Sequence, residues 1–209
     1  MRVRRTLKLH PTDTVHYLVD SCFLVNKYLD VRHISDKGHL KRVESSQKWW
    51  QVIERQVASR KAKVFVPDIV VAETFKALSK KFYGAHWPYA SSYTAARNRL
   101  RDDIHLPSKE ARSPSRKVGF HDIQLNRDII ISVDRFFELA AKKYKSVSIV
   151  DIIVAATGKY LIDFYGFSKS DLTIVTTDAD LYGLCRACGD LPPTFNPDLP
   201  SDASNKVFT

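Results

Sequence analysis

Short apolar runs alternate with amphipathic stretches along most of this chain. Four runs have the length and the β-branched or aromatic content of buried strands: VHYLV at 15–19, KVFVP at 63–67, DIIIS at 128–132 and LTIVTTD at 172–178. The intervening patterns predict helices over 21–29, 43–59, 69–82, 90–103, 133–144, 149–165 and 179–188. Because short strands that are apolar on both faces alternate with helices, we predict an α/β sandwich with a covered parallel sheet.

Several local features carry more specific expectations. Trp50 lies on the apolar stripe of its helix and should be buried, whereas Trp49 lies off it. Trp49 could therefore stack on a nucleic-acid base or pack against the next element. The polar segment 30–42 is expected to be a loop, and Asp68 is expected to cap the helix 69–82. Gly189 is expected to cap the C-terminal end of the helix 179–188.

The positions of the polar and proline-rich segments along the chain predict one main domain. A length of 209 residues suffices for a single hydrophobic core. We assign residues 1–13 to a basic N-terminal arm, 14–195 to the domain and 196–209 to an irregular tail, with an edge strand near 194–195. A polar helix followed by a Pro/Ser/Arg-rich stretch marks an insertion at about 84–119.

The charge of the chain favours a polyanionic partner. The formal net charge is +10 and the pI is about 9.5, which favours nucleic acid, although a basic surface also confers solubility. Seven basic and three acidic residues lie between Arg97 and Lys117. This stretch is the best candidate for phosphate contacts, and a solvated charged loop is the alternative. The predicted RNA-binding residues are Arg97, Arg99, Arg101, Arg112, Arg116 and Lys117.

Other composition features exclude several classes of protein. Three cysteines argue against a disulfide framework and for a reducing compartment, and Cys185 and Cys188 lack the further ligands of a zinc site. The sequence has no apolar run long enough for a membrane span and no dinucleotide or P-loop glycine motif. We therefore expect a cytoplasmic protein with no membrane partner.

Four carboxylates are predicted at the edge of the sheet where the strands end. Asp20 and Asp178 directly follow strands, and Glu73 and Asp151 lie early in helices that begin at this edge. Ligands of open α/β sheets bind there, so the four side chains should meet. Asp151 is the most telling, because its neighbours in SIVDIIVAAT are apolar and an unpaired buried charge costs several kcal/mol.

Each carboxylate also has a purely local explanation. Asp20 and Asp178 can cap the helices that follow them, and Asp151 can form a capping box with Ser148. Glu73 can pair with a lysine further along its own helix. These explanations account for the residues singly, but they do not explain why all four come to one edge.

A divalent cation would reconcile the four charges. Clustered carboxylates repel one another and raise each other's pKa. Mg²⁺ and Mn²⁺ prefer oxygen ligands, and such ions can bridge a phosphodiester, activate water and stabilise the leaving oxygen. A basic surface around an acidic, metal-filled site is the arrangement that a nuclease needs.

The ordered set of motifs resembles the PIN-domain ribonuclease family, which includes the VapC-type toxins. The segments that carry the resemblance are YLVDSCFLV, VPDIVVAET, LAAKKYKSVSIVDIIVAAT and IVTTDAD, within about 14–83 and 120–195. The resemblance implies a three-layer α/β/α fold with a mainly parallel sheet and a Mg²⁺- or Mn²⁺-dependent endoribonuclease. The site residues that it implies are Asp20, Glu73, Asp151 and Asp178, with Thr176 orienting the fourth acid and Asp180 as an additional ligand.

Two features depart from the compact toxins of this family. The insertion at about 84–119 lengthens the chain, and Ser21-Cys22 follows Asp20 where the family often has Thr-Ser. The resemblance implies RNA as the substrate. It leaves open a cognate antitoxin, a homodimer and a stand-alone processing nuclease.

A second hypothesis is a PIN-like module that binds RNA or a protein without cutting. An intact set of four acids argues against it, because a binding module has no need to keep their repulsion. A phosphatase motif of the Asp-x-Asp type matches DAD at 178–180, but it follows the last strong strand instead of the first. The nuclease is therefore the preferred hypothesis.

Overall fold

A five-stranded parallel sheet forms the centre of the molecule. The computed structural model describes residues 14–86, 89–104, 120–144 and 146–199. In these residues the strand order is β3-β2-β1-β4-β5, and every neighbouring pair is parallel. The strands are β1 (Val15–Val19), β2 (Ala62–Pro67), β3 (His121–Ile123), β4 (Leu172–Val175) and β5 (Thr194–Phe195).

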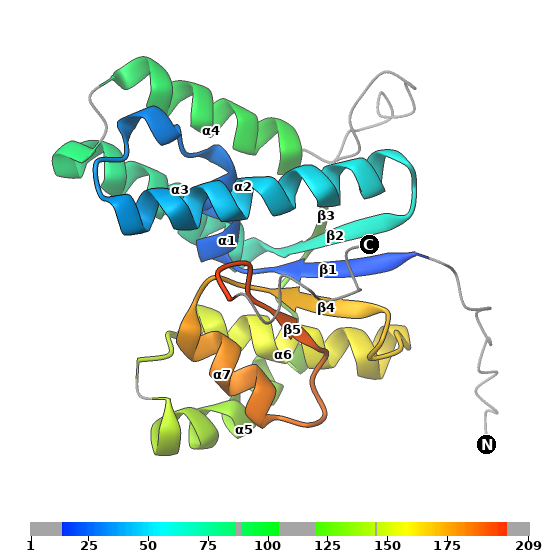
Figure 1. The fold of residues 1–209 in the computed structure, drawn as a ribbon. Helices are drawn as coiled ribbons and strands as arrows, with labels where there is room; N and C mark the ends of the chain where they lie inside the picture. Colours follow the sequence, from blue (N-terminus) through cyan, green and yellow to red (C-terminus); the bar gives the residue numbers. More distant parts are fainter. Residues whose placement is uncertain (1–13, 87–88, 105–119, 145, 200–209) are drawn as a thin grey trace, which may run out of the picture.

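Helices cover both faces of the sheet and complete the expected three layers (Figure 1). One face carries α1 (Ser21–Tyr28), α2 (Lys37–Ala58) and α3 (Asp68–Lys81), with α4 (Ala90–Ile104) packed outside on α1 and α3. The other face carries α6 (Ile149–Tyr165), with α5 (Arg127–Lys143) and α7 (Ala179–Ala187) packed against it. Two short segments complete the described elements: the 3-10 turn η1 (Val31–His33) and the π-helical turn η2 (Phe82–His86).

The direction in which the sheet grows reverses between β1 and β4. After β1 the chain builds outward through β2 and β3, crosses to the other face with α5 and α6, and then adds β4 on the opposite side of β1. Val19 pairs with Val175, and the backbone N–H of Asp20 donates to the carbonyl oxygen of Val175 at 3.2 Å. Open parallel sheets bind ligands at such a switch point, outside the carboxyl ends of the strands.

Two tryptophans fix α2 against the rest of the domain. Trp50 is buried as predicted, and its indole N–H donates to the carbonyl oxygen of Phe23 at 3.0 Å. Trp49 is partly buried and packs edge-on against Phe195, with ring centroids 4.9 Å apart. Packing against a neighbouring element, and not base stacking, therefore accounts for Trp49.

The predicted strand at 128–132 is wrong, because this run lies in helix α5. Asn126 caps the helix by accepting a hydrogen bond from the backbone N–H of Ile129 at 3.0 Å. The buried residues of α5 follow a helical period: Ile129, Val133, Phe136 and Ala140. Ile130 and Ile131 are exposed, so only one of the three consecutive isoleucines belongs to the core. The third strand of the chain is instead β3.

Three smaller expectations also need correction. Helix α2 begins at Lys37, inside the predicted loop 30–42, because the Asp36 side chain accepts from the backbone N–H of His39 at 2.6 Å. Asp68 is the first residue of α3 and makes no capping hydrogen bond. Cys188, instead of Gly189, is the C-cap of α7. None of the helices in the described ranges combines the length and apolar character needed to cross a bilayer.

The helical assignment of 128–132 predicts unequal effects for two neighbouring isoleucines. Ile129→Ala should destabilise the protein by about 2–5 kcal/mol, because Ile129 is fully buried. Ile131→Ala should change stability by less than about 0.5 kcal/mol, because Ile131 is 63% exposed. Chemical denaturation would measure both, and equal losses would support a doubly buried strand instead.

Candidate active site

Asp20 lies at the switch point, directly after β1, and is only 1% exposed. It caps α1, because its Oδ1 accepts from the backbone N–H of Phe23 at 2.7 Å. Its Oδ2 accepts from the hydroxyl of Thr176. Burial raises the pKa of Asp20 to about 8; the hydrogen bonds oppose this shift, and the charges of Asp151 and Asp178 add to it.

Thr176 and Asp178 follow β4, the neighbour of β1 in the sheet. The Thr176 hydroxyl accepts from the backbone N–H of Asp178 at 2.8 Å while it donates to Asp20. The Oδ1 atom of Asp178 caps α7 by accepting from the backbone N–H groups of Asp180 and Leu181, both at 2.8 Å. Thr176 therefore holds the backbone of one acid and the carboxylate of another.

Asp151 lies in the first turn of α6 and forms a capping box with Ser148. Its Oδ2 accepts from the backbone N–H of Ser148 at 2.9 Å and from the Ser148 hydroxyl at 2.7 Å. Burial raises the pKa of Asp151; these hydrogen bonds oppose the shift, and Asp178 and Glu73 add to it. The helix-capping role of Asp151 is thus compatible with its position close to other acids.

Glu73 projects from the second turn of α3 toward α1. The hydroxyl of Ser21 donates to Glu73 Oε2 at 2.5 Å, and no salt bridge joins Glu73 to the lysines along α3. The sequence reasoning gave Ser21 no role. Its position offered one signal, because Ser21 directly follows Asp20 and so begins α1 at the same edge of the sheet.

Cys22 lies within electrostatic reach of all four predicted acids. Burial raises the pKa of its thiol far above the ordinary value. Four charges then raise it further, and they belong to Asp20, Asp178, Asp151 and Glu73. The carboxylate of Asp180, predicted as an additional ligand, accepts a hydrogen bond from the hydroxyl of Ser146.

The four carboxylates suit a hard cation by their chemistry. Among the described residues, none of the four has a salt-bridge partner. Oδ1 of Asp151, Oδ2 of Asp178 and Oε1 of Glu73 accept no hydrogen bond from the described part of the chain. Such oxygens match the ligand preference of Mg²⁺ and Mn²⁺. Within the same ranges, however, no three His, Cys, Asp or Glu side chains already stand together as a metal site.

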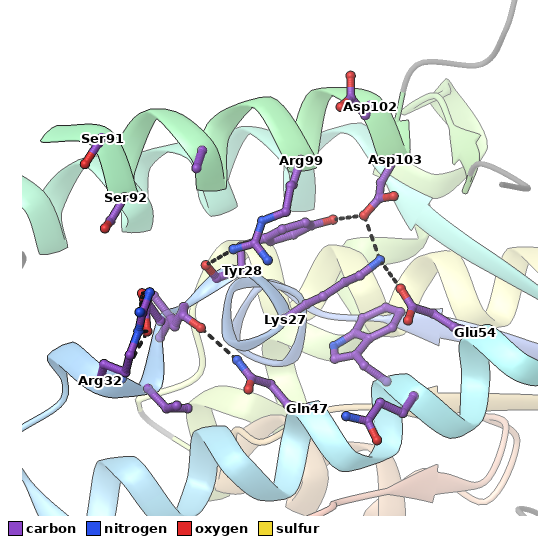
Figure 2. A pocket seen from close by; sticks show the side chains of 16 residues that line it. Lys27, Tyr28, Arg32, Gln47, Glu54, Ser91, Ser92, Arg99, Asp102 and Asp103 are labelled. Atoms are coloured by element: carbon purple, nitrogen blue, oxygen red, sulfur yellow. Dashed lines mark hydrogen bonds and ion pairs between the residues drawn. The ribbon is translucent and has the colours of Figure 1, made fainter. Parts of the chain in front are cut away.

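The three arginines of α4 that were predicted to bind RNA lie on two opposite faces of the helix. Arg97 and Arg101 line a groove toward α3, whereas Arg99 lines a cavity of about 900 Å³ between α1, α2 and α4 (Figure 2). A spacing of four residues keeps two side chains on one face, and a spacing of two separates them. The other predicted RNA-binding residues lie outside the described residues: Arg112, Arg116 and Lys117.

Lys27 occupies the centre of this cavity and joins three helices. Its amino group lies 2.9 Å from Glu54 Oε1 on α2 and 2.7 Å from Asp103 Oδ2 on α4. The same amino group lies over the rings of Trp50 and Phe120, at 5.0 and 4.6 Å from their centroids. These paired charges stabilise the packing of α4, and they leave little positive charge for a phosphate.

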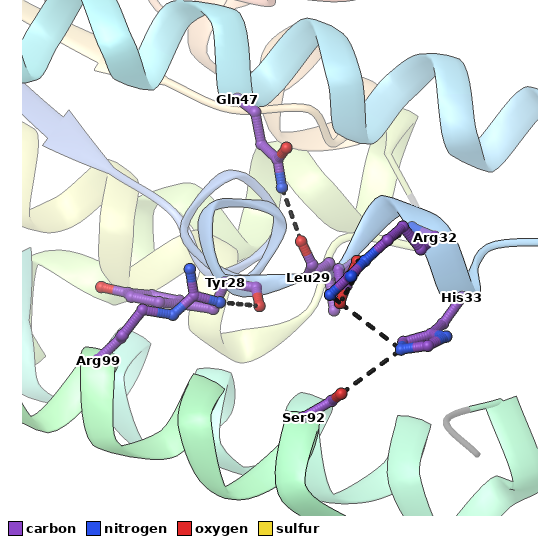
Figure 3. Close-up of polar contacts among 8 residues, drawn as sticks. Tyr28, Leu29, Arg32, His33, Gln47, Ser92 and Arg99 are labelled. Atoms are coloured by element: carbon purple, nitrogen blue, oxygen red, sulfur yellow. Dashed lines mark hydrogen bonds and ion pairs between the residues drawn. The ribbon is translucent and has the colours of Figure 1, made fainter. Parts of the chain in front are cut away.

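The polar groups at the C-terminal end of α1 are also internally satisfied (Figure 3). Arg99 donates to the carbonyl oxygen of Tyr28 at 3.0 Å, and Gln47 donates to that of Leu29 at 2.8 Å. His33 Nε2 lies 3.4 Å from the Ser92 hydroxyl. The polar contacts that line the cavity thus connect α4 to the core of the domain.

Removal of the Lys27 charge should loosen α4. Lys27→Met keeps most of the aliphatic stem but leaves Asp103 and Glu54 without their cation. Because the group is largely buried, we expect a loss of about 1–3 kcal/mol in the free energy of unfolding. Lys48→Met, at an exposed position of α2, should change it by less than about 0.5 kcal/mol. Equal effects in urea denaturation would contradict the role given to Lys27.

The raised pKa of Asp20 predicts a pH-dependent stability of the metal-free protein. A carboxyl group whose pKa rises from 3.8 to about 8 on folding stabilises the fold in its protonated form. That contribution is complete at acidic pH and is lost as the pH rises through about 8. With EDTA present, the Tm should fall between mildly acidic and mildly alkaline pH, and Asp20→Asn should reduce this fall while keeping the cap. If the Tm of wild type and that of Asp20→Asn changed with pH in parallel, the raised pKa of Asp20 would be contradicted.

No protein-family model and no curated protein matches this sequence. Solved structures do match. FitAcB from Neisseria gonorrhoeae has a TM-score of 0.50 and 15% identity, over 87% of this chain and 97% of that one. VapBC2 from Rickettsia felis, bound to a DNA fragment from its promoter, has a TM-score of 0.49 and 12% identity over 87% and 98%. VapC20 from Mycobacterium tuberculosis, a toxin that cleaves the sarcin-ricin loop, has a TM-score of 0.46 and 16% identity over 85% and 99%. At such identities the likeness concerns the fold alone, and the chain has the PIN/VapC-like fold.

Proposed function

We propose that this protein is a Mg²⁺- or Mn²⁺-dependent endoribonuclease that hydrolyses RNA phosphodiester bonds. The observation that supports the proposal is the position of four acids near the switch point of the sheet, where the charge of each raises the pKa of the Cys22 thiol. None of these acids has a cation partner among the described residues. The net charge of +10 makes the rest of the surface suitable for a polyanion.

In this proposal Asp20, Glu73, Asp151 and Asp178 hold the cation. The bound ion supplies Lewis-acid chemistry, which lowers the pKa of a water molecule and stabilises the leaving oxygen. The protein's own contribution is to position the ligands. On Asp151, Asp178 and Glu73, a capping or serine contact occupies one carboxylate oxygen and leaves the other available. Thr176 sets the separation of two strand ends by bonding to both.

Protonation of Asp20 links this chemistry to pH. With its pKa raised to about 8, Asp20 holds a proton at neutral pH in the metal-free protein. The proton must leave before this carboxylate binds a cation, so metal affinity should rise with pH.

One observation favours the alternative of a PIN-like module that binds RNA without cutting. In the described residues each acid is engaged in a cap or serine contact, and no three stand together as a metal site. Such a module would keep RNA binding when a carboxylate is neutralised and would show no metal-dependent stabilisation.

The resemblance to VapC-type toxins extends the proposal to protein partners, either a cognate antitoxin or a second copy of the chain. Large apolar side chains stay exposed on α5, on the outer layer of the fold, and a partner would cover them. These side chains are Ile130, Ile131 and Phe137.

Neutralisation of Asp151 tests the proposed metal chemistry. Asp151→Asn should abolish RNA cleavage and should remove most of the Mn²⁺-induced rise in Tm seen in wild type. Without metal, the variant should be at least as stable as wild type, because a repelling buried charge is gone while asparagine can still accept from Ser148.

Asp163→Asn is the matched control for this substitution. Asp163 is a carboxylate on the same helix, exposed near its far end and paired with Lys159. The control should retain both cleavage and the Mn²⁺-induced shift in Tm. The proposal is wrong if Asp151→Asn still cleaves RNA and Mn²⁺ shifts the Tm of neither the wild type nor the Asp163→Asn control.

A further inference from the structure

A groove between α3 and α4 remains unexplained by the carboxylate site and by the Lys27 cavity. It has a volume of about 500 Å³ and shares no lining residue with that cavity. Its walls combine aromatic rings with two arginines and contain no acidic residue. The lining residues are Phe75, Ser79, Tyr83, Tyr93, Arg97, Arg101 and Ile104.

Tyr83 is presented to solvent at the start of the π-helical turn η2. Its side chain is 78% exposed, the largest exposed fraction among the large hydrophobic residues described as exposed. The ring contacts Phe82 and Tyr93 in T-shaped geometry, with centroids 4.9 and 6.2 Å away, so neither neighbour stacks parallel to it. Short π-helical segments are rare and frequently occur at functional sites.

Two arginines flank this ring without compensating acids. Arg97 and Arg101 lie four residues apart on one face of α4, where like charges repel. Neither forms a salt bridge with any residue in the described ranges. The Arg97 guanidinium lies over the Tyr93 ring, 5.3 Å from its centroid, and Tyr93 stacks on Phe82 at 4.7 Å. The arrangement therefore combines a largely exposed aromatic ring with two arginines that form no salt bridge in the described ranges.

We infer that this groove binds an unpaired base of single-stranded RNA, with the base on Tyr83 and the adjacent phosphates near Arg97 and Arg101. Exposed aromatic side chains bind single strands because every base has a π face, and arginines track the backbone. A duplex buries its base faces between neighbours, so the groove selects unpaired RNA. An RNA strand matches the lining better than a protein segment does, because it offers π faces and closely spaced negative charges together.

This inference rests on the proposed function for its substrate and adds a second contact to it. Glu73 and Tyr83 are ten residues apart along α3 and its π turn, or about 15 Å at the rise of a helix. Because the groove lies away from the four carboxylates, it would anchor the strand beyond the bond that is cut. The two sites can therefore be tested separately.

The test is equilibrium binding of a labelled, unstructured RNA of about 12 nucleotides, measured by fluorescence anisotropy in EDTA so that cleavage plays no part. Tyr83→Ala should weaken binding about tenfold. Tyr83→Phe keeps the ring and should bind within about twofold of wild type. Tyr165→Ala is the matched control, because Tyr165 is 59% exposed on α6 and belongs to another face of the molecule; it should bind like wild type.

Two further measurements separate the base from the phosphates. Binding of a fully paired RNA duplex should not depend on Tyr83. Arg97→Gln and Arg101→Gln should each reduce the slope of log affinity against log salt concentration by about 0.7, the value for one phosphate contact on a single strand. Unchanged melting temperatures of the variants would show that the fold is intact.

Each outcome decides between the inference and the proposed function. RNA affinity like that of wild type in Tyr83→Ala, or equal losses of affinity in Tyr83→Ala and Tyr165→Ala, would contradict RNA binding by the groove. The proposed metal-dependent cleavage would be unaffected. A monomer–dimer equilibrium that depends on Tyr83, with unchanged RNA binding, would assign the groove to a second copy of the chain. That result would also contradict RNA binding by the groove. RNA binding that depends on Tyr83, without any metal-dependent cleavage, would support the RNA-binding groove and contradict the proposed nuclease function.

Discussion

The parallel pairing of β1 with β4 is the constraint on which the relative position of Asp20 and Asp178 depends. Because Val19 pairs with Val175, the next residues of both strands leave the sheet together, and the Thr176 hydroxyl can bond to the Asp20 carboxylate and the Asp178 backbone at once. A slip of one residue would turn every side chain of a strand to the other face of the sheet. The same register places Asp20 and Asp178 where each starts a helix.

Helix capping by these acids is compatible with their proposed function. Asp20, Asp151 and Asp178 each stabilise a helix start, and the charge of each raises the pKa of the Cys22 thiol. Burial raises the pKa of Asp20 and Asp151, so the metal-free fold carries an electrostatic cost where the site is assembled. Costs of this kind are typical of functional sites, because residues arranged for chemistry or binding are not arranged for maximal stability.

Helix α4 shows how the same residue type takes different roles on two faces of one element. Arg99 lies on the face that contains the Lys27 ion pairs and connects α4 to the core. Arg97 and Arg101 lie on the other face, in a groove that no acid lines and that an exposed tyrosine borders. The basic composition of the stretch alone could not separate these roles, because composition does not record on which face of a helix a charge lies.

Periodicity in the sequence determined most of the local structure, including the strands near 15–19 and 63–67 and the helices that carry Glu73 and Asp151. The strand predicted at 172–178 is present but already ends at Val175. Periodicity failed at 128–132, because a run of three isoleucines suits a strand or a helix equally and only the packing of Ile129 decides. The placement of Asp151 survived this error, since a helix that leads into a parallel strand must start at the carboxyl edge. Tertiary structure alone decided the strand order, the Ser21–Glu73 contact and the groove beside Tyr83. Such contacts join residues as far apart as Asp20 and Thr176, 156 positions along the chain, and no local period of the sequence encodes them.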